Sequence, residues 1–349
     1  MFDSTRRVRI ALDAMGGDHG PEVIIRGAIE ALRTIEGNFE ILLVGNEPII
    51  WEILSRLDPG PLPLFSVHAE EQVEMAEKAP RAFRTKPRSS IAVCTSLVGR
   101  QRAQALVSAG NTGAVVAASL LNLGRMPGIH RPAIAVTFPT ARGHCVVLDV
   151  GANADCKPVH LFQFALMGRI FANVVLGISQ PRVGLMNIGE EPTKGSALAQ
   201  AAHHLLAAER ERLNFVGNVE GRDIFEGGAD VVVCDGFTGN VILKLAGSIA
   251  SFGGRMAANA LKRSLLYQMG ALLLKPAIMD LKRRFDYEEY GGALLLGTRG
   301  ISVICHGKSS PRAIKNALRV ALRATERDME GLIAQELAGQ EPTILPVAR

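Results

Sequence analysis

The chain has 349 residues, and its 39 lysines and arginines against 34 aspartates and glutamates give a formal net charge of +5. With 48% hydrophobic and 21% charged residues, the composition excludes a disordered chain and predicts a globular protein with a large core. Aromatic residues make up only 5%, which argues against a surface for stacking single-stranded nucleic acid, so we expect no nucleic-acid partner.

Short apolar runs alternate with helix-forming segments from the N-terminus onward. Strands are expected at residues 8–12, 39–44, 64–67, 105–107, 134–136, 145–148, 183–186, 215–216 and 231–234, and helices at 21–32, 89–101, 160–175 and 196–209. Continuous apolar strands alternating with helices predict an α/β fold with a mainly parallel, open sheet of Rossmann-like type, covered by helices on both faces. We expect residues 1–349 to form a single α/β catalytic unit.

Residues 241–285 differ from the rest, because they have helical character without strand signals. Between Arg255 and Phe285 basic residues exceed acidic ones by six, and apolar residues interleave with them. Such a basic, amphipathic hairpin favours either a dimer interface or contact with an anionic membrane surface. The two are compatible if the base dimerises and the tip contacts lipid through the leucines Leu265, Leu266, Leu272 and Leu273.

The cysteines and the N-terminus indicate the compartment. The five cysteines include no Cys-x-x-Cys pair, which favours reduced thiols in a cytoplasmic protein. Residues 1–9 are polar and no apolar signal core follows them. We also expect no apolar run of the roughly 18 residues that a bilayer span requires, so any membrane contact is peripheral.

Glycine-rich polar turns follow several of the expected strands, at residues 13–20, 108–114, 148–153, 186–190 and 235–240. In an open α/β sheet such turns gather at the carboxyl edge, where ligands bind. Glycine lets backbone N–H groups approach an anion, and the next helix N-terminus adds positive potential. We therefore expect one anion-binding site built from these turns.

Polar residues of three kinds are candidates for that site. The asparagines that follow strands are Asn111, Asn153, Asn187, Asn218 and Asn240. Each could donate to phosphate or to an oxyanion, and each could instead only cap a helix or a turn. Lys194 is expected at the start of a helix, where it opposes the dipole, so anion binding explains it better than stability does. Lys157 is a weaker case because Asp155 can neutralise it.

Three aspartates, Asp13, Asp149 and Asp235, each close a strand. Turn capping is the better interpretation for Asp13 and Asp149. Gly-x-Gly-x-x-Gly after a strand, Gly-x-Ser-x-Gly and His-Glu-x-x-His are all absent, which argues against a dinucleotide, a serine nucleophile and zinc. We expect no cofactor and no metal.

At these turns the chain resembles the bacterial acyl-acyl-carrier-protein:phosphate acyltransferase family of phospholipid synthesis. The matching stretches are residues 11–21, 108–114, 148–158, 183–195, 215–223, 229–244 and 290–296. The resemblance implies a fold akin to phosphate acetyltransferases and isocitrate-dehydrogenase-type enzymes. It implies transfer of a long acyl chain from acyl carrier protein to inorganic phosphate, which forms acyl phosphate. It also implies a homodimer whose hairpin associates with the inner face of the cell membrane and passes product to a membrane glycerol-3-phosphate acyltransferase.

The residues at the strand ends suit this chemistry, which needs two anions held in place and an oxyanion stabilised, whereas the resemblance does not rank them. The expected catalytic residues are Lys194, Asn240 and Asp235. The expected substrate-binding residues are Asn111, Thr112, Gly113, Asp149, Asn153, Lys157, Asn187, Asn218, Thr238 and Gly239. The acidic carrier protein is expected to meet basic residues of the hairpin or of the cluster Arg81, Arg84, Lys86 and Arg88. The alternatives are a short-chain phosphate acyltransferase that uses coenzyme A, and a non-catalytic membrane scaffold of lipid synthesis.

Overall fold

The computed structural model describes residues 7–77, 85–284 and 287–339, without the side chains of Leu265 and of residues 280–287. Arg81 and Arg84 lie outside the described residues. The strands are β1 Val8–Asp13, β2 Phe39–Gly45, β3 Leu64–His68, β4 Ala105–Ser108, β5 Ala133–Thr140, β6 Gly143–Leu148, β7 Val183–Met186, β8 Phe215–Val219, β9 Val231–Val233, β10 Ala293–Leu296 and β11 Ile301–Ile304. The helices are α1 Pro21–Thr34, α2 Glu47–Leu57, α4 Ser90–Gly99, α5 Thr112–Asn122, α6 Pro158–Leu176, α7 Ala197–Ala208, α8 Arg210–Leu213, α9 Gly221–Glu226, α10 Gly236–Leu261, α11 Leu265–Leu273, α12 Lys275–Arg284, η1 Tyr287–Tyr290, α13 Pro311–Glu326 and α14 Met329–Leu337.

All these strands form one sheet in the order β3-β2-β1-β4-β11-β10-β5-β6-β9-β7-β8. The first five strands of that order are mutually parallel, and so are the last four. Between the two groups, β10 is antiparallel to β11 and to β5, and β5 is antiparallel to β6. The predicted α/β fold with a mainly parallel sheet is therefore confirmed, but its two parallel groups run in opposite directions.

The sequence analysis did not predict β10 and β11. They are short apolar runs separated by a turn that contains Gly297 and Gly300, so a turn signal was present. Their antiparallel pairing reverses the direction of the sheet near its middle. The expectation that all the glycine turns share one edge was therefore wrong, because the turns after β1 and β4 lie at the opposite edge of the sheet from those after β6, β7 and β9.

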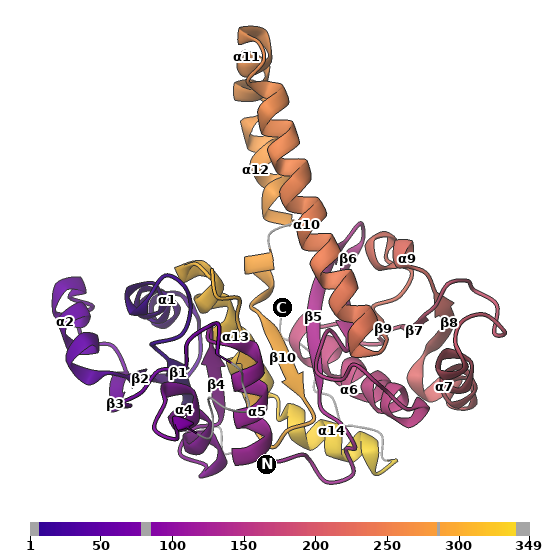
Figure 1. Cartoon of the computed structure of the whole chain (residues 1–349), viewed down its shortest axis with the longest axis horizontal. Helices are drawn as coiled ribbons and strands as arrows, with labels where there is room; N and C mark the ends of the chain where they lie inside the picture. Colours follow the sequence, from indigo (N-terminus) through magenta and orange to yellow (C-terminus); the bar gives the residue numbers. More distant parts are fainter. Residues whose placement is uncertain (1–6, 78–84, 285–286, 340–349) are drawn as a thin grey trace.

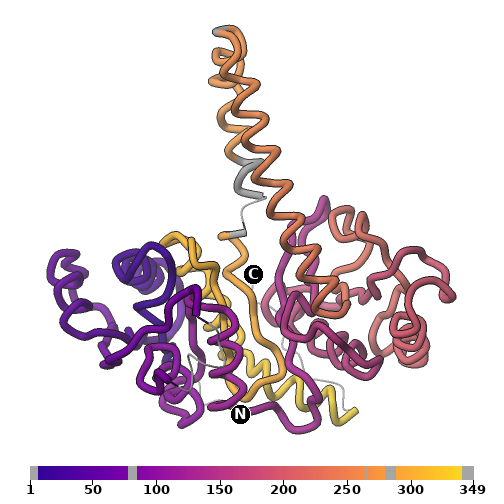
Figure 2. The backbone as a smooth tube through the Cα atoms, in the orientation of Figure 1, coloured from indigo at the N-terminus to yellow at the C-terminus, as the bar shows by residue number. Residues whose placement is uncertain are grey.

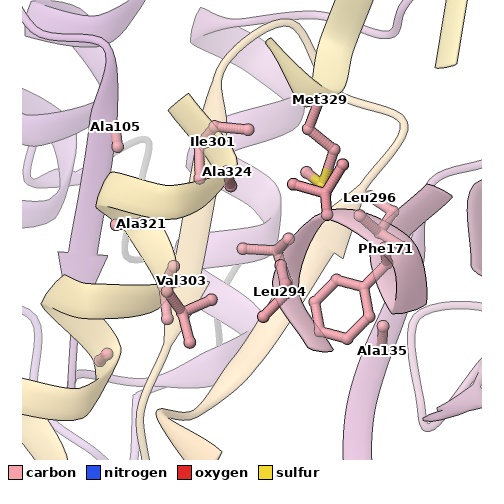
Figure 3. Packing of buried hydrophobic residues seen from close by; sticks show 14 of the residues in the cluster. Ala105, Ala135, Phe171, Leu294, Leu296, Ile301, Val303, Ala321, Ala324 and Met329 are labelled. Atoms are coloured by element: carbon pink, nitrogen blue, oxygen red, sulfur yellow. The ribbon is translucent and has the colours of Figure 1, made fainter. Parts of the chain in front are cut away.

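Helices cover both faces of the sheet and bury two hydrophobic clusters. One cluster joins alternate strand residues to α1, α6, α7, α13 and α14, and the other joins the remaining strand residues to α4, α5, α9 and α10. Figure 3 shows the first cluster near the reversal, where Phe171 of α6 lies beside Leu294 of β10; Met329 of α14 belongs to the same cluster. The reversal is thus held by a dry core that joins the two halves.

Helix α6 is the central helix of that core. It has 19 residues and is apolar enough by composition to cross a membrane, contrary to the expectation from the sequence. However, 78% of its most apolar window is buried inside the protein. Its apolarity is accounted for by packing between the sheet and the helices α7, α13 and α14.

A helical hairpin protrudes from the sheet and its covering helices, as the fold prediction required (Figures 1 and 2). Its first helix, α10, has 26 residues, begins with buried glycines at the edge of the sheet and continues outward as an exposed helix. At 1.5 Å per residue this helix is roughly 39 Å long. Helix α11 forms the tip and α12 returns beside α10.

Candidate active site

The loops after β6, β7, β8 and β9 lie at one edge of the sheet, because these strands are parallel neighbours. Lys194 follows β7 and Asn240 belongs to the first turns of α10, directly after β9. The two residues therefore belong to adjacent strand ends on the same edge. Residues on neighbouring strand ends of one sheet edge can contribute to the same site.

Asp149 organises the turn after β6. Its carboxylate is fully buried and accepts hydrogen bonds from the N–H groups of Ile134, Gly151, Ala152 and Asn153, at 2.7–3.1 Å. The Asn153 amide also donates to Asp149, at 2.9 Å, and to the Pro132 carbonyl, at 2.7 Å. These contacts favour the turn-capping interpretation of Asp149 and extend it to Asn153, since both side chains point into the protein.

The N-terminus of α10 packs directly on that turn. A Cβ atom at Gly239 would lie 1.9 Å from the Asp149 carbonyl oxygen, so only glycine fits there. Asp235 caps the helix, since its carboxylate accepts bonds from the Thr238 N–H at 2.9 Å and from the Thr238 hydroxyl at 2.8 Å. Asp235, Thr238 and Gly239 thus fix the start of the helix on the turn after β6.

Asn240 differs from those neighbours. Its side chain is half-buried beside Gly151, with its amide carbon 3.7 Å from the position of a Cβ atom on that glycine. The amide group makes no hydrogen bond to any described residue. It is therefore a preformed neutral donor at the surface of the turn, which suits an oxyanion or a phosphate oxygen.

Lys194 lies in the loop between β7 and α7, residues 187–196, which we call the lysine loop. The helix begins at Ala197 with Ser196 as its N-cap, so Lys194 precedes the helix rather than starting it. Its side chain is exposed, and its ammonium group forms no ion pair with a described residue. An unpaired ammonium group on a short loop is available to bind an anion.

Side chains hold the lysine loop by its carbonyl groups. The Asn187 amide donates to the Lys194 carbonyl at 3.1 Å, and the Asn218 amide donates to the Glu191 carbonyl at 2.8 Å. Gln200 donates to the Thr193 and Gly195 carbonyls at 2.8 and 3.2 Å. Behind Asn218, the buried His203 ring forms a 3.0 Å hydrogen bond with the amide oxygen of Asn218.

Most backbone N–H groups of the lysine loop form no hydrogen bond with described residues, in contrast to the carbonyls just named. Ile188 donates to the Asn187 side chain and Lys194 donates to the Glu191 carbonyl. The N–H groups of the other non-proline residues from 189 to 196 have no acceptor among the described residues. Because side chains bind four of its carbonyls while most of its N–H groups stay unbound, the loop offers backbone donors for an anion beside a lysine.

Asn111, Thr112 and Gly113 lie at the opposite edge of the sheet, after β4. Asn111 caps α5 through the Ala114 N–H, and its amide donates to the Met75 and Glu77 carbonyls. Thr112 and Gly113 are exposed in the first turn of α5. No hydrogen bond or ion pair in the described structure joins these three residues to the lysine loop or to Asn240.

Asp13 lies beside this second group of turns. It is fully buried and accepts bonds from the Ser108 hydroxyl at 2.6 Å and the Met15 N–H at 3.1 Å. Burial raises the pKa of its carboxyl group, and the hydrogen bonds from Ser108 and Ser90 oppose that rise. Asp13 thus ties β1 to β4, in agreement with the structural interpretation. Lys157 is exposed at the N-cap of α6, where it could still meet an anion.

Sequence reasoning missed two residues of this edge, His203 and Gln200. They lie three residues apart on α7, so they share the helix face toward the lysine loop. Their polar spacing is the only sequence signal, and spacing does not show that a side chain will bind a backbone carbonyl.

The cysteines near the site cannot act as thiolates at neutral pH. Burial and, secondarily, the Asp149 charge raise the pKa of Cys156 to about 11. Burial also raises the pKa of Cys234 well above its ordinary value, with Asp235 and Asp149 adding to the effect. These thiols are therefore poor nucleophiles, and the edge offers anion binding instead of covalent cysteine chemistry.

Comparison with solved structures defines the class first. The chain resembles a phosphotransacetylase from Streptococcus pyogenes with a TM-score of 0.64 at 16% identity, over 92% of this chain and 95% of that one. It resembles the EutD phosphotransacetylase from Staphylococcus aureus with a TM-score of 0.61 at 14% identity, over 91% and 94% of the two chains. The fold is thus that of the phosphotransacetylase-like α/β proteins.

Sequence relatives identify the family more narrowly. The model of the family described as "Fatty acid synthesis protein" matches residues 8–331. A phosphate acyltransferase of Heliobacterium modesticaldum is 51% identical over 95% of this chain and 98% of its own length, and one of Myxococcus xanthus is 49% identical over 91% and 90%. The chain belongs to this family of phosphate acyltransferases and is a transferase of acyl groups.

Proposed function

We propose that this enzyme moves a long-chain acyl group from acyl carrier protein to inorganic phosphate, and that the acyl phosphate supplies phospholipid synthesis. The observation that carries the proposal is the lysine loop, in which side chains bind the carbonyls of residues 191 and 193–195, while most of its N–H groups and the Lys194 ammonium group have no partner among the described residues. The loop lies on the same sheet edge as the unpaired Asn240 amide. A dianion and a developing oxyanion are the ligands that such donors suit.

The proposed reaction depends on how the enzyme positions phosphate and the thioester more than on proton transfer. A phosphate oxygen attacks the thioester carbonyl carbon, the carbonyl oxygen becomes an oxyanion, and the C–S bond then breaks to release thiolate. Phosphate is anionic at neutral pH, and a thiol of pKa near ~8.5 is a good leaving group. Lys194 and the amides of the lysine loop hold the phosphate, and Asn240 stabilises the oxyanion. Asp235 and Asp149 act by shaping the edge.

Two candidate functions differ in the acyl donor, which is a thioester of either carrier protein or coenzyme A. Coenzyme A thioesters would serve the same chemistry, and the solved neighbours of this fold are phosphotransacetylases. The hairpin favours the long-chain donor, because a short acyl group needs no apolar helix beside a membrane. At the tip, Leu266, Leu272 and Leu273 are at least 70% exposed, and Lys262, Arg263 and Lys275 flank them.

These side chains support a peripheral position at the inner face of the cell membrane. Exposed leucines insert between lipid headgroups, and each nearby basic residue adds about 1 kcal/mol on an anionic surface. The side chain of Leu265 lies outside the described residues. A location on the membrane would let the enzyme pass its poorly soluble product to a glycerol-3-phosphate acyltransferase in the same bilayer.

The lower part of α10 supports a homodimer. Val241, Leu245, Ile249, Phe252 and Met256 are exposed apolar residues at a spacing of three or four, so they form one stripe along the helix. We call these residues the α10 stripe. A stripe of this length is rarely left in water, and the same stripe of a second copy would cover it.

The test is a donor comparison with a lysine control. Purified enzyme is given phosphate and either palmitoyl-carrier protein or palmitoyl-coenzyme A, and acyl phosphate is trapped with hydroxylamine. We expect the carrier-protein thioester to react with the higher kcat/KM, and Lys194→Ala to reduce it at least 100-fold with an unchanged Tm. A higher kcat/KM with palmitoyl-coenzyme A would mean that the coenzyme A thioester is the acyl donor. Wild-type activity in Lys194→Ala would exclude the lysine loop from the mechanism.

A further inference from the structure

A groove lies between α13 and the C-terminal end of α6, away from the site described above. Two adjoining cavities, of about 380 and 580 Å³, share the residues Val175, Leu176, Arg319 and Arg323. Lys157 caps the other end of α6, near the Asp149 turn. The groove is therefore separated from the candidate active site by roughly the length of a 19-residue helix, about 28 Å.

Arginines line this groove in a row. Arg319 and Arg323 are four residues apart on α13, and Arg327 follows four residues later as the C-cap, so the three lie along one side of the helix and line the second cavity. None of them forms an ion pair with a described residue. Arg312 of the same helix, by contrast, pairs with both Glu288 and Glu289. Within the described residues the row therefore forms no ion pair, although the charge of Glu326 acts on Arg323 and Arg327.

Few of the guanidinium N–H groups in this row donate hydrogen bonds to described residues. Arg323 donates to the Val175 carbonyl at 3.3 Å, as expected of a cation at the C-terminus of a helix. Arg319 donates to Asn316 of its own helix at 2.7 Å. Burial lowers the pKa of Arg323, the neighbouring charges of Arg319 and Arg327 lower it further, and the charge of Glu326 opposes that change. An anion between the guanidinium groups of Arg319 and Arg323 would offset the repulsion between them.

The acidic residues of the groove lie mainly at its other end. Glu36 and Glu326 line the second cavity, beside Arg327, and the pKa of Glu326 is raised by burial. In the first cavity the acid is Glu289, which is already paired with Arg312 at 3.1 Å. The positive charge that borders both cavities is therefore that of Arg319 and Arg323, of which Arg323 is partly compensated by Glu326.

Aromatic rings line the first cavity next to these arginines. His144 and Tyr290 pack edge to face, with ring centroids 5.2 Å apart. Burial lowers the pKa of His144, so its ring is neutral at pH 7 and presents a flat, uncharged surface. A planar base can pack on such rings while its phosphates reach the guanidinium groups, each of which binds phosphate through a pair of N–H groups.

We propose that this groove is a nucleotide-binding site, in which Arg319 and Arg323 bind the phosphates of a nucleoside polyphosphate and the His144–Tyr290 pair contacts its base. The site is independent of the acyl-transfer reaction. It lies on the opposite face of the sheet from α10, because α6 and α13 belong to one hydrophobic cluster and α10 to the other.

Isothermal titration of the full chain with ATP tests the proposal, with pyrophosphate as the probe that lacks a base. We expect micromolar binding of ATP and binding of pyrophosphate weaker by roughly tenfold, because base stacking is lost. Arg319→Gln and Arg323→Gln should each weaken ATP binding by about tenfold or more, since each removes a charge-assisted contact. Arg100→Gln is the matched control, because Arg100 is exposed, forms no ion pair with described residues and is the C-cap of α4, away from the groove.

Three results would overturn the proposal. They are no heat of ATP binding up to millimolar concentration, equal affinity for pyrophosphate and ATP, and ATP affinity that the two groove variants leave unchanged. A circular dichroism melt of each variant shows whether it is folded, and an Arg→Lys pair at the same positions, which retains the charge, should recover part of the affinity. Activity toward phosphate is expected to stay within twofold of wild type in both glutamine variants, because the groove is remote from the lysine loop.

Discussion

Asn218 gives the sharpest test of how the lysine loop is held. Asn218→Ala deletes the 2.8 Å bond to the Glu191 carbonyl and leaves the buried ring nitrogen of His203 without its 3.0 Å partner. An unsatisfied buried group of this kind costs about 1–3 kcal/mol. At about 2 °C of Tm per kcal/mol for a chain of this size, the variant should melt roughly 2–6 °C lower.

Asn218→Ala should also weaken phosphate binding. In the variant without phosphate, we expect the lysine loop to sample several conformations, so its N–H groups and Lys194 become ordered only when phosphate binds. The free energy of that ordering raises KM for phosphate. A loss of 1.4 kcal/mol corresponds to about tenfold in kcat/KM. We expect most of it in KM for phosphate and little in KM for the acyl donor, measured by initial rates with each substrate varied in turn.

A double-mutant cycle separates positioning from general destabilisation. His203→Phe removes the ring nitrogen but keeps an aromatic side chain in the same buried place, and the pair should couple by about 0.5–3 kcal/mol. The reasoning fails if Asn218→Ala lowers Tm as predicted but leaves KM for phosphate unchanged. In that case the clamp serves stability alone.

The remaining predictions concern the hairpin and the packing of α10. The double variant Leu272→Asp and Leu273→Asp should lose flotation with anionic vesicles while retaining activity toward dispersed donor, because the changes touch only the exposed tip. Unchanged flotation would argue against lipid contact by α11. Leu245→Arg places a charge in the middle of the α10 stripe and should shift sedimentation velocity from dimer to monomer; a persistent dimer would locate the interface elsewhere. Gly239→Ala should lower the free energy of unfolding by at least 2 kcal/mol, because its Cβ atom would lie 1.9 Å from the Asp149 carbonyl oxygen. A chemical denaturation curve like that of wild type would mean that the turn can relax.

Much of the fold could be predicted from the sequence, because its strands are continuous apolar runs bounded by glycine turns. Runs such as 39–44 and 183–186 fall within a residue of β2 and β7. The direction of the sheet could not be predicted in the same way. It depends on β10 and β11, which are four residues each and follow the hairpin. Four apolar residues carry no information on which neighbour they will pair with.

The candidate site residues were chosen by residue type, and their roles stay predictions. Among the asparagines at strand ends, Asn187 and Asn218 bind carbonyls of the lysine loop. Asn153 holds the turn after β6, and Asn240 alone among these four has an amide without a described hydrogen bond. A sequence shows which residues can donate, whereas the direction in which each amide points depends on tertiary packing.

The pairing of β11 with β4 has a consequence for how the chain acquires its structure during synthesis. Residues 8–108 supply most strands of the N-terminal half, yet the neighbour of β4 is made almost two hundred residues later, and α13, which packs on α1, later still. Residues 133–233, which contain β5 to β9, are contiguous. On the ribosome the second half can therefore assemble while the first still has an open strand edge, and that edge closes only when the chain is nearly complete.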